Sequence, residues 1–61
     1  MDILKKMKEM LQDEYDGIKQ YIALMQEAGM YCEEFKHIIC EELCHVSILT
    51  KMIKEVEDKQ K

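Results

Sequence analysis

The chain has 61 residues, of which 48% are apolar and 36% are charged. A core of this size contributes only a few kcal/mol, so chains this short usually depend on disulfides, a metal or oligomerisation. The absence of Pro and the presence of only two Gly exclude an all-β fold, whose tight turns need both. The net charge of −4 leaves no basic face for nucleic-acid phosphates.

Apolar residues recur at helical spacing in residues 3–28 and again in residues 35–56. Gly29 follows the first pattern in the position that a helix C-cap favours. We therefore predict a single all-α domain, residues 1–61, that forms an antiparallel two-helix hairpin. Its helices are expected at about 3–28 and 32–57, with a tight turn between them.

A lone hairpin of two such helices leaves much of its apolar surface uncovered. Each helix of about 26 residues is about 39 Å long and carries a full apolar stripe. A second copy related by a two-fold axis would cover that surface and give a four-helix bundle. The predicted partner is therefore the chain itself, as a homodimer or a higher homo-oligomer.

Membrane and disulfide signals are both missing from the sequence. No apolar run approaches the roughly 20 residues that span a bilayer, and the first residues lack the apolar block of a signal peptide. The three cysteines are odd in number and contain no C-x-x-C pair: Cys32, Cys40 and Cys44. We expect free thiols in a cytoplasmic protein that binds neither membrane nor nucleic acid.

Two acidic residues interrupt the apolar stripes. Glu14 lies at the centre of the first stripe, Glu42 at the centre of the second, and His45 lies one turn beyond Glu42 on nearly the same face. A Glu-x-x-His pair on a helix directs a carboxylate and an imidazole to one ion. Glu14 lies about as far before the turn as the pair lies after it, so the three side chains should meet.

A two-fold copy would double this set to four carboxylates and two imidazoles. One Glu from each of two helices and a Glu-x-x-His from each of the other two is the ligand set of carboxylate-bridged dimetal bundles. Such oxygen-rich coordination suits iron or manganese, and zinc or copper could also bind. The alternative is a buried polar pair of Glu42 and His45, which would leave several carboxylates desolvated in one core.

A longer pattern runs through these residues: Glu14-Tyr15-Asp16-Gly17-Ile18-Lys19-Gln20-Tyr21, then Gly29, Phe35 and Glu42-Leu43-Cys44-His45. Over most of residues 14–49 it resembles the first helical pair of the ferritin-like superfamily, most closely the rubrerythrins. The resemblance implies that Glu14 is a terminal ligand, Glu42 a bridging carboxylate and His45 a nitrogen ligand. Tyr21, near the site, is the candidate catalytic residue.

Rubrerythrins carry four helices and a rubredoxin domain in one chain, whereas this sequence carries one helical pair. Short ferritin-like proteins built from two-helix subunits, as in the encapsulated ferritins, are the nearer architectural match. The resemblance thus implies a ferritin-like four-helix bundle assembled from two chains. It further implies that electrons come from an external donor.

The leading hypothesis is a di-iron carboxylate protein with two iron ions per dimer. It would react with O2 or peroxide, as a ferroxidase or a peroxide reductase. One alternative is a metal-binding or zinc-bound structural bundle without catalytic activity, and another is a coiled-coil interaction module. Tyr21 is equally well explained as a core residue, and Cys40 and Cys44 as free thiols, as soft-metal ligands or as a contact between bundles.

Overall fold

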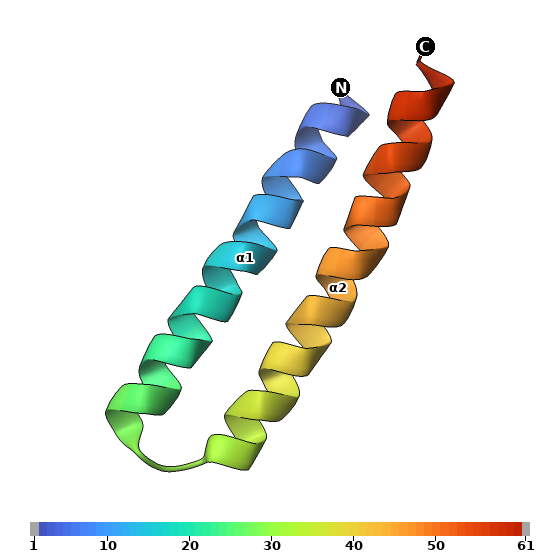
Figure 1. The fold of residues 1–61 in the computed structure, drawn as a ribbon. Helices are drawn as coiled ribbons and strands as arrows, with labels where there is room; N and C mark the ends of the chain where they lie inside the picture. Colours follow the sequence, from blue (N-terminus) through green and yellow to red (C-terminus); the bar gives the residue numbers. More distant parts are fainter. Residues whose placement is uncertain (1, 61) are drawn as a thin grey trace.

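The computed structural model describes residues 2–60 and contains two antiparallel helices, α1 (Ile3–Ala28) and α2 (Cys32–Lys59), which lie side by side (Figure 1). The hairpin measures 47 × 16 × 13 Å. Within residues 2–60 there are no strands, so the all-α hairpin prediction is confirmed. The second helix ends two residues later than the sequence predicted, at Lys59, which adds a basic residue to its last turn.

Local side-chain and backbone caps define both ends of α1. At its start the carboxylate of Asp2 accepts a hydrogen bond from the backbone N–H of Lys5 at 3.0 Å. At its end Gly29 adopts a left-handed conformation, with φ of 65°, and its N–H donates to the carbonyl of Met25 at 3.2 Å. Only glycine adopts this conformation without strain, which explains why the helix stops there.

The start of α2 has a less favourable backbone conformation and capping than the two ends of α1. Tyr31 precedes α2 with φ of 59°, a left-handed conformation that is uncommon for a bulky residue. No side chain caps the first turn of α2, although Glu33 and Glu34 lie there and favour the positive end of the helix dipole. The carbonyl of Tyr31 accepts the first helical hydrogen bond, from the N–H of Phe35 at 3.0 Å.

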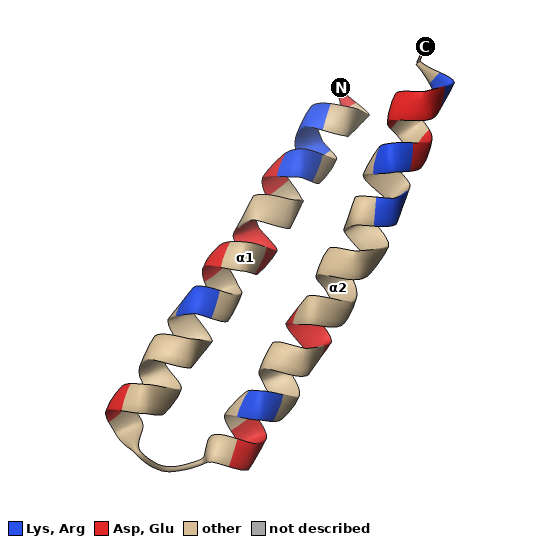
Figure 2. Ribbon diagram, viewed as in Figure 1, with Lys and Arg blue, Asp and Glu red and all other residues tan. Residues whose placement is uncertain are grey.

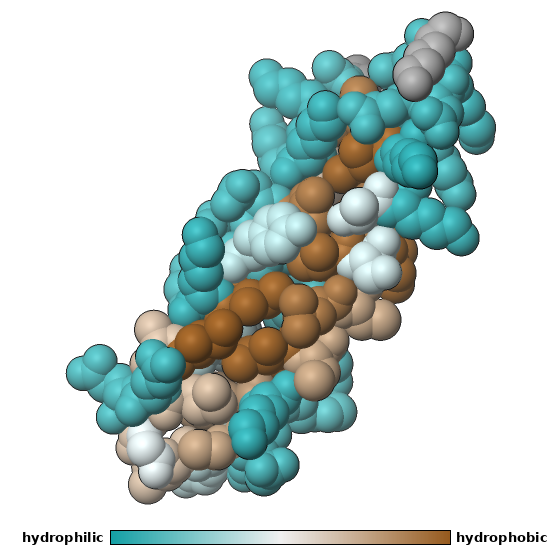
Figure 3. Space-filling model, viewed as in Figure 1, coloured by the Kyte–Doolittle hydropathy of each residue, from teal (hydrophilic) through white to brown (hydrophobic). Residues whose placement is uncertain are grey.

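The core of the hairpin is thin. Among the described residues, Met7 of α1 and Ile53 of α2 are the buried apolar side chains, each 7% exposed. Many large apolar side chains remain exposed: Ile3, Met10, Tyr15, Ile22, Leu24, Met30, Tyr31, Leu43, Ile48 and Met52. Figure 3 shows one face of the hairpin, on which hydrophobic residues follow the line between the helices. The single hairpin therefore leaves apolar surface in contact with solvent.

Charged residues of both signs occur along both helices (Figure 2). Lys8 and Glu57 form an ion pair between α1 and α2 with an Nζ–Oε2 distance of 3.3 Å near the open end. Because both side chains are about half exposed, this pair contributes at most about 1 kcal/mol. Within residues 2–60, neither helix is long and apolar enough to cross a membrane.

Candidate metal centre

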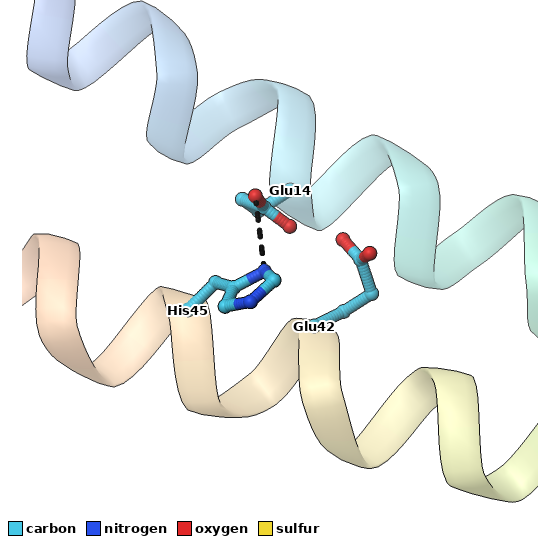
Figure 4. A group of neighbouring side chains, drawn as sticks. All are labelled: Glu14, Glu42 and His45. Carbon is cyan, nitrogen blue, oxygen red and sulfur yellow. Dashed lines mark ion pairs between the residues drawn. The ribbon is translucent and has the colours of Figure 1, made fainter.

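The structure brings the three predicted ligand side chains together near the middle of the hairpin (Figure 4). Glu14 comes from α1, and Glu42 and His45 come from α2 one turn apart. One donor atom from each residue lies within 4.8 Å of the other two. We call Glu14, Glu42 and His45 the donor cluster. Within residues 2–60 it is the one group of three or more His, Cys, Asp or Glu side chains that converges in this way.

Glu14 joins the two helices at this point. Its Oε1 lies 3.5 Å from Nδ1 of His45, and its side chain is 24% exposed. Its other oxygen, Oε2, is buried and has no hydrogen-bond partner among the described residues. A buried acceptor without a donor costs about 1–3 kcal/mol, and more when it is charged. A cation in the donor cluster would supply the missing partner.

The pKa of Glu42 is affected by the neighbouring carboxyl group of Glu14. This pKa is raised above the ordinary value by the Glu14 carboxylate, which accepts a hydrogen bond when Glu42 is protonated, by burial and by the negative charge of Glu14. Glu41 raises the pKa further, whereas His45 lowers it. Two adjacent carboxyl groups cannot both ionise freely in such a site. Without a cation Glu42 therefore holds a proton more tightly than an isolated glutamate would.

Gly17 leaves space beside the Glu42 carboxylate. A Cβ atom placed on Gly17 would lie 3.5 Å from Oε2 of Glu42, at ordinary contact distance. No larger side chain of α1 therefore separates this carboxylate from its surroundings at that position. The oxygen-rich donor set and the unpartnered Oε2 of Glu14 together fit a metal ion.

His45 is more exposed than its sequence position suggested. Helical periodicity predicted that His45 lies inside the apolar stripe of the second helix, yet its side chain is 51% exposed. It lies one turn from Glu42 at the edge of the stripe, so the single partner helix covers only part of the ring. In the hairpin, the donor cluster is therefore open on the side of His45.

Tyr21 lies two helical turns from Glu14, about 10 Å along the helix axis. It is half-buried, and its ring packs against Phe35 of α2 with ring centroids 6.4 Å apart and an interplanar angle of 44°. Phe35 lies seven residues before Glu42, just as Tyr21 lies seven residues after Glu14. In an antiparallel hairpin both aromatic residues are therefore displaced from the donor cluster towards the turn by the same two helical turns. Tyr21 thus packs in the layer next to the cluster, and its catalytic role stays a prediction.

The second Glu-x-x-His motif, Glu34 to His37, does not converge on a site. The imidazole Nε2 of His37 instead lies 2.7 Å from Oε1 of Glu41, one turn further along α2. Sequence spacing did not single out Glu41, which contacts His37 and also raises the pKa of Glu42. The three cysteines are free and exposed: Cys32, Cys40 and Cys44.

Comparisons with protein-family models, with curated proteins and with solved structures found no match for this chain. The ferritin-like resemblance therefore depends on the motif residues alone. What the geometry adds is the convergence of two carboxylates and one imidazole from two helices.

Proposed function

We propose that this chain is a di-iron protein in which two copies of the hairpin pair as a ferritin-like four-helix bundle. The bundle would hold two iron ions and react with O2 or peroxide, as a ferroxidase or a peroxide reductase. The observation that carries the proposal is the donor cluster, which supplies half of a carboxylate-bridged dimetal ligand set from one chain.

The electrostatics of the cluster favour a cation. The raised pKa of Glu42 arises from its neighbour Glu14, and a bound cation would relieve that repulsion and allow both groups to ionise. Two carboxylates to one imidazole is an oxygen-rich set, which favours iron or manganese over the metals that prefer thiolates. Iron, when bound, would supply the redox chemistry with O2 or peroxide.

The residues of the chain have separate roles in this proposal. Glu14, Glu42 and His45 would together hold the iron, and the ferritin-like resemblance implies a bridging role for Glu42 and terminal roles for Glu14 and His45. Gly17 would leave an approach for a small substrate beside Glu42, because it places no side chain there. Tyr21, one layer away, is the candidate catalytic residue that the resemblance implies, and electrons would come from an external donor.

The exposed apolar residues indicate which face the second copy would cover. Residues spaced by seven lie on one face of a helix that packs in a bundle. One such row on α1 has three exposed members and a glycine: Ile3, Met10, Gly17 and Leu24. The corresponding row on α2 contains His45: Ile38, His45 and Met52. We call these two rows the cluster face, because Gly17 adjoins Glu42 and His45 adjoins Glu14.

A second copy on the cluster face would cover these apolar side chains and bring a second donor cluster towards the first. It would also enclose His45, which the single hairpin leaves half exposed. Enclosure strengthens metal–ligand electrostatics by excluding water. The thin core and the open metal centre are therefore both explained by one partner.

Metal content is the direct test of the site. The purified chain, loaded with Fe²⁺ under anaerobic conditions and desalted, should retain one iron per chain by elemental analysis. Glu42→Ala and His45→Ala should each lose most of it. Glu34→Ala is the matched control, since Glu34 also begins a Glu-x-x-His motif on α2 but does not converge with the cluster. Full iron content in Glu42→Ala would overturn the proposed site.

Charge substitutions test the pairing face. Leu24→Lys and Met52→Lys lie on the cluster face and should reduce the sedimentation mass from twice the 7.3 kDa chain to one chain. Ile22→Lys and Leu43→Lys are the controls. Each lies two residues from a cluster-face position, which turns it about 200° around the helix. Dissociation by the control pair alone would place the interface on the opposite face.

The exposed apolar surface also favours a second candidate function, a helical interaction module without a metal. That function predicts that a chelator leaves the melting temperature of the purified protein unchanged. The di-iron proposal predicts a fall on chelation, because metal binds only the folded state. A metal store without activity would bind iron but show no change in absorbance on adding peroxide.

A further inference from the structure

The outer side of α2 carries a set of donor residues that the proposed di-iron centre does not use. His37, Cys40, Glu41 and Cys44 follow one another at intervals of three, one and three residues, and all four side chains are exposed. We call them the thiol stripe. In contrast to Glu14, Glu42 and His45, they come from one helix, and both cysteines are free.

We propose that the thiol stripe is a second metal site, in which Cys40, Cys44 and Glu41 bind a thiophilic cation such as Zn²⁺. Side chains at positions i and i+4 of a helix lie about 5–6 Å apart at their Cβ atoms, a separation that two metal ligands can close. The same spacing joins the two zinc-binding histidines of the H-E-x-x-H motif. Here Cys40-Glu41-Glu42-Leu43-Cys44 places thiols at those two positions.

Glu41 lies between the two thiols in sequence and one turn before Cys44, so its carboxylate is the third ligand. It is also tied to His37, whose Nε2 lies 2.7 Å from Oε1 of Glu41. Carboxylates that bind metals are themselves hydrogen-bonded by outer groups, which fix the direction of the ligand. His37 is thus a positioning residue for Glu41.

The donor atoms of the thiol stripe do not converge within the distance that the donor cluster shows. Binding therefore requires new side-chain rotamers, which exposed residues adopt without disturbing the core. Thiolate sulfur selects zinc and copper(I), whereas the carboxylates of the donor cluster favour iron or manganese. The two sites are consequently expected to hold different metals in the same chain.

Cobalt(II) distinguishes the two sites, because thiolate ligands give it an intense near-ultraviolet charge-transfer absorption. Titration of Co²⁺ into the reduced full-length chain should develop this absorption to one equivalent per chain, and Zn²⁺ should then abolish it. Cys40→Ser and Cys44→Ser should each remove the absorption. Glu41→Gln should weaken binding by at least about tenfold.

Cys32→Ser is the matched control, since Cys32 is an exposed cysteine of the same helix outside the stripe. It should keep the full absorption, and so should Glu42→Ala, which separates this site from the proposed di-iron centre. No thiolate absorption in the unaltered chain would overturn the proposal. Equal loss in Cys32→Ser would do the same, and so would saturation at half an equivalent, which indicates a site shared between two chains.

Discussion

The Nδ1 atom of His45 lies 3.5 Å from Oε1 of Glu14, although the two residues belong to different helices. This contact joins α1 and α2 at the level of the donor cluster. It also holds the imidazole next to the carboxylate whose second oxygen has no partner. The stability of the metal-free chain should therefore respond to changes in and around the donor cluster.

The pH dependence of stability follows from Glu42. Its pKa is raised in the folded chain, so the folded state binds a proton more tightly than the unfolded state. Stability is therefore fully present below the unfolded value, about pH 4.3, and falls as pH rises through the raised pKa. Glu42→Gln should flatten this fall. Urea unfolding of the metal-free protein between about pH 4 and pH 7 measures it, and an unchanged slope in the variant would contradict the assignment.

Gly17→Ala should stabilise the metal-free chain by about 0.5–1 kcal/mol, because alanine favours a helix interior over glycine. The added Cβ would meet Oε2 of Glu42 only at 3.5 Å, so no steric cost offsets the gain. Gly17→Leu should lose that gain, since its longer side chain would displace the Glu42 carboxylate. Ala23→Gly, at an exposed position of the same helix, is the reverse control and should cost about 1 kcal/mol.

Two substitutions in the turn should change the stability of the chain in opposite directions, although the two positions have similar backbone angles. Gly29 and Tyr31 have φ of 65° and 59°. Gly29→Ala should destabilise the chain by about 1 kcal/mol, because a Cβ is strained in this conformation. Tyr31→Asn should stabilise it by up to about 1 kcal/mol, because asparagine tolerates left-handed angles better. Thermal unfolding measures both, and a stabilising Gly29→Ala would show that Gly29 does not adopt the left-handed conformation.

The thin core makes individual apolar residues important. Ile53→Ala should lower the free energy of unfolding by about 2 kcal/mol, near the lower end for core truncations, because the hairpin packs against it from one side. Ile48 is the matched control, as an isoleucine of the same helix that is 52% exposed. Ile48→Ala should cost less than about 0.5 kcal/mol by urea denaturation. Equal losses for the two variants would mean that α2 packs with a different face.

The sequence by itself determined the two helices, their bounds within two residues, and the identity of the three side chains that converge. These features follow from apolar periodicity, from Gly29 and from counting residues to the turn, and all three are local properties of the chain. The distance of Glu14 and Glu42 from the turn was enough to predict that they share a level, because helix rise is constant.

Only the tertiary structure decided how those residues meet. The rotation of α1 against α2 leaves Oε2 of Glu14 buried, places Gly17 beside Glu42 and exposes half of His45. The rise along a helix is a property of the backbone, whereas the rotation and spacing of two helices depend on how all facing side chains pack. The sequence pattern therefore located the donor cluster, whereas packing raised the pKa of Glu42 and left the cluster open on the side of His45.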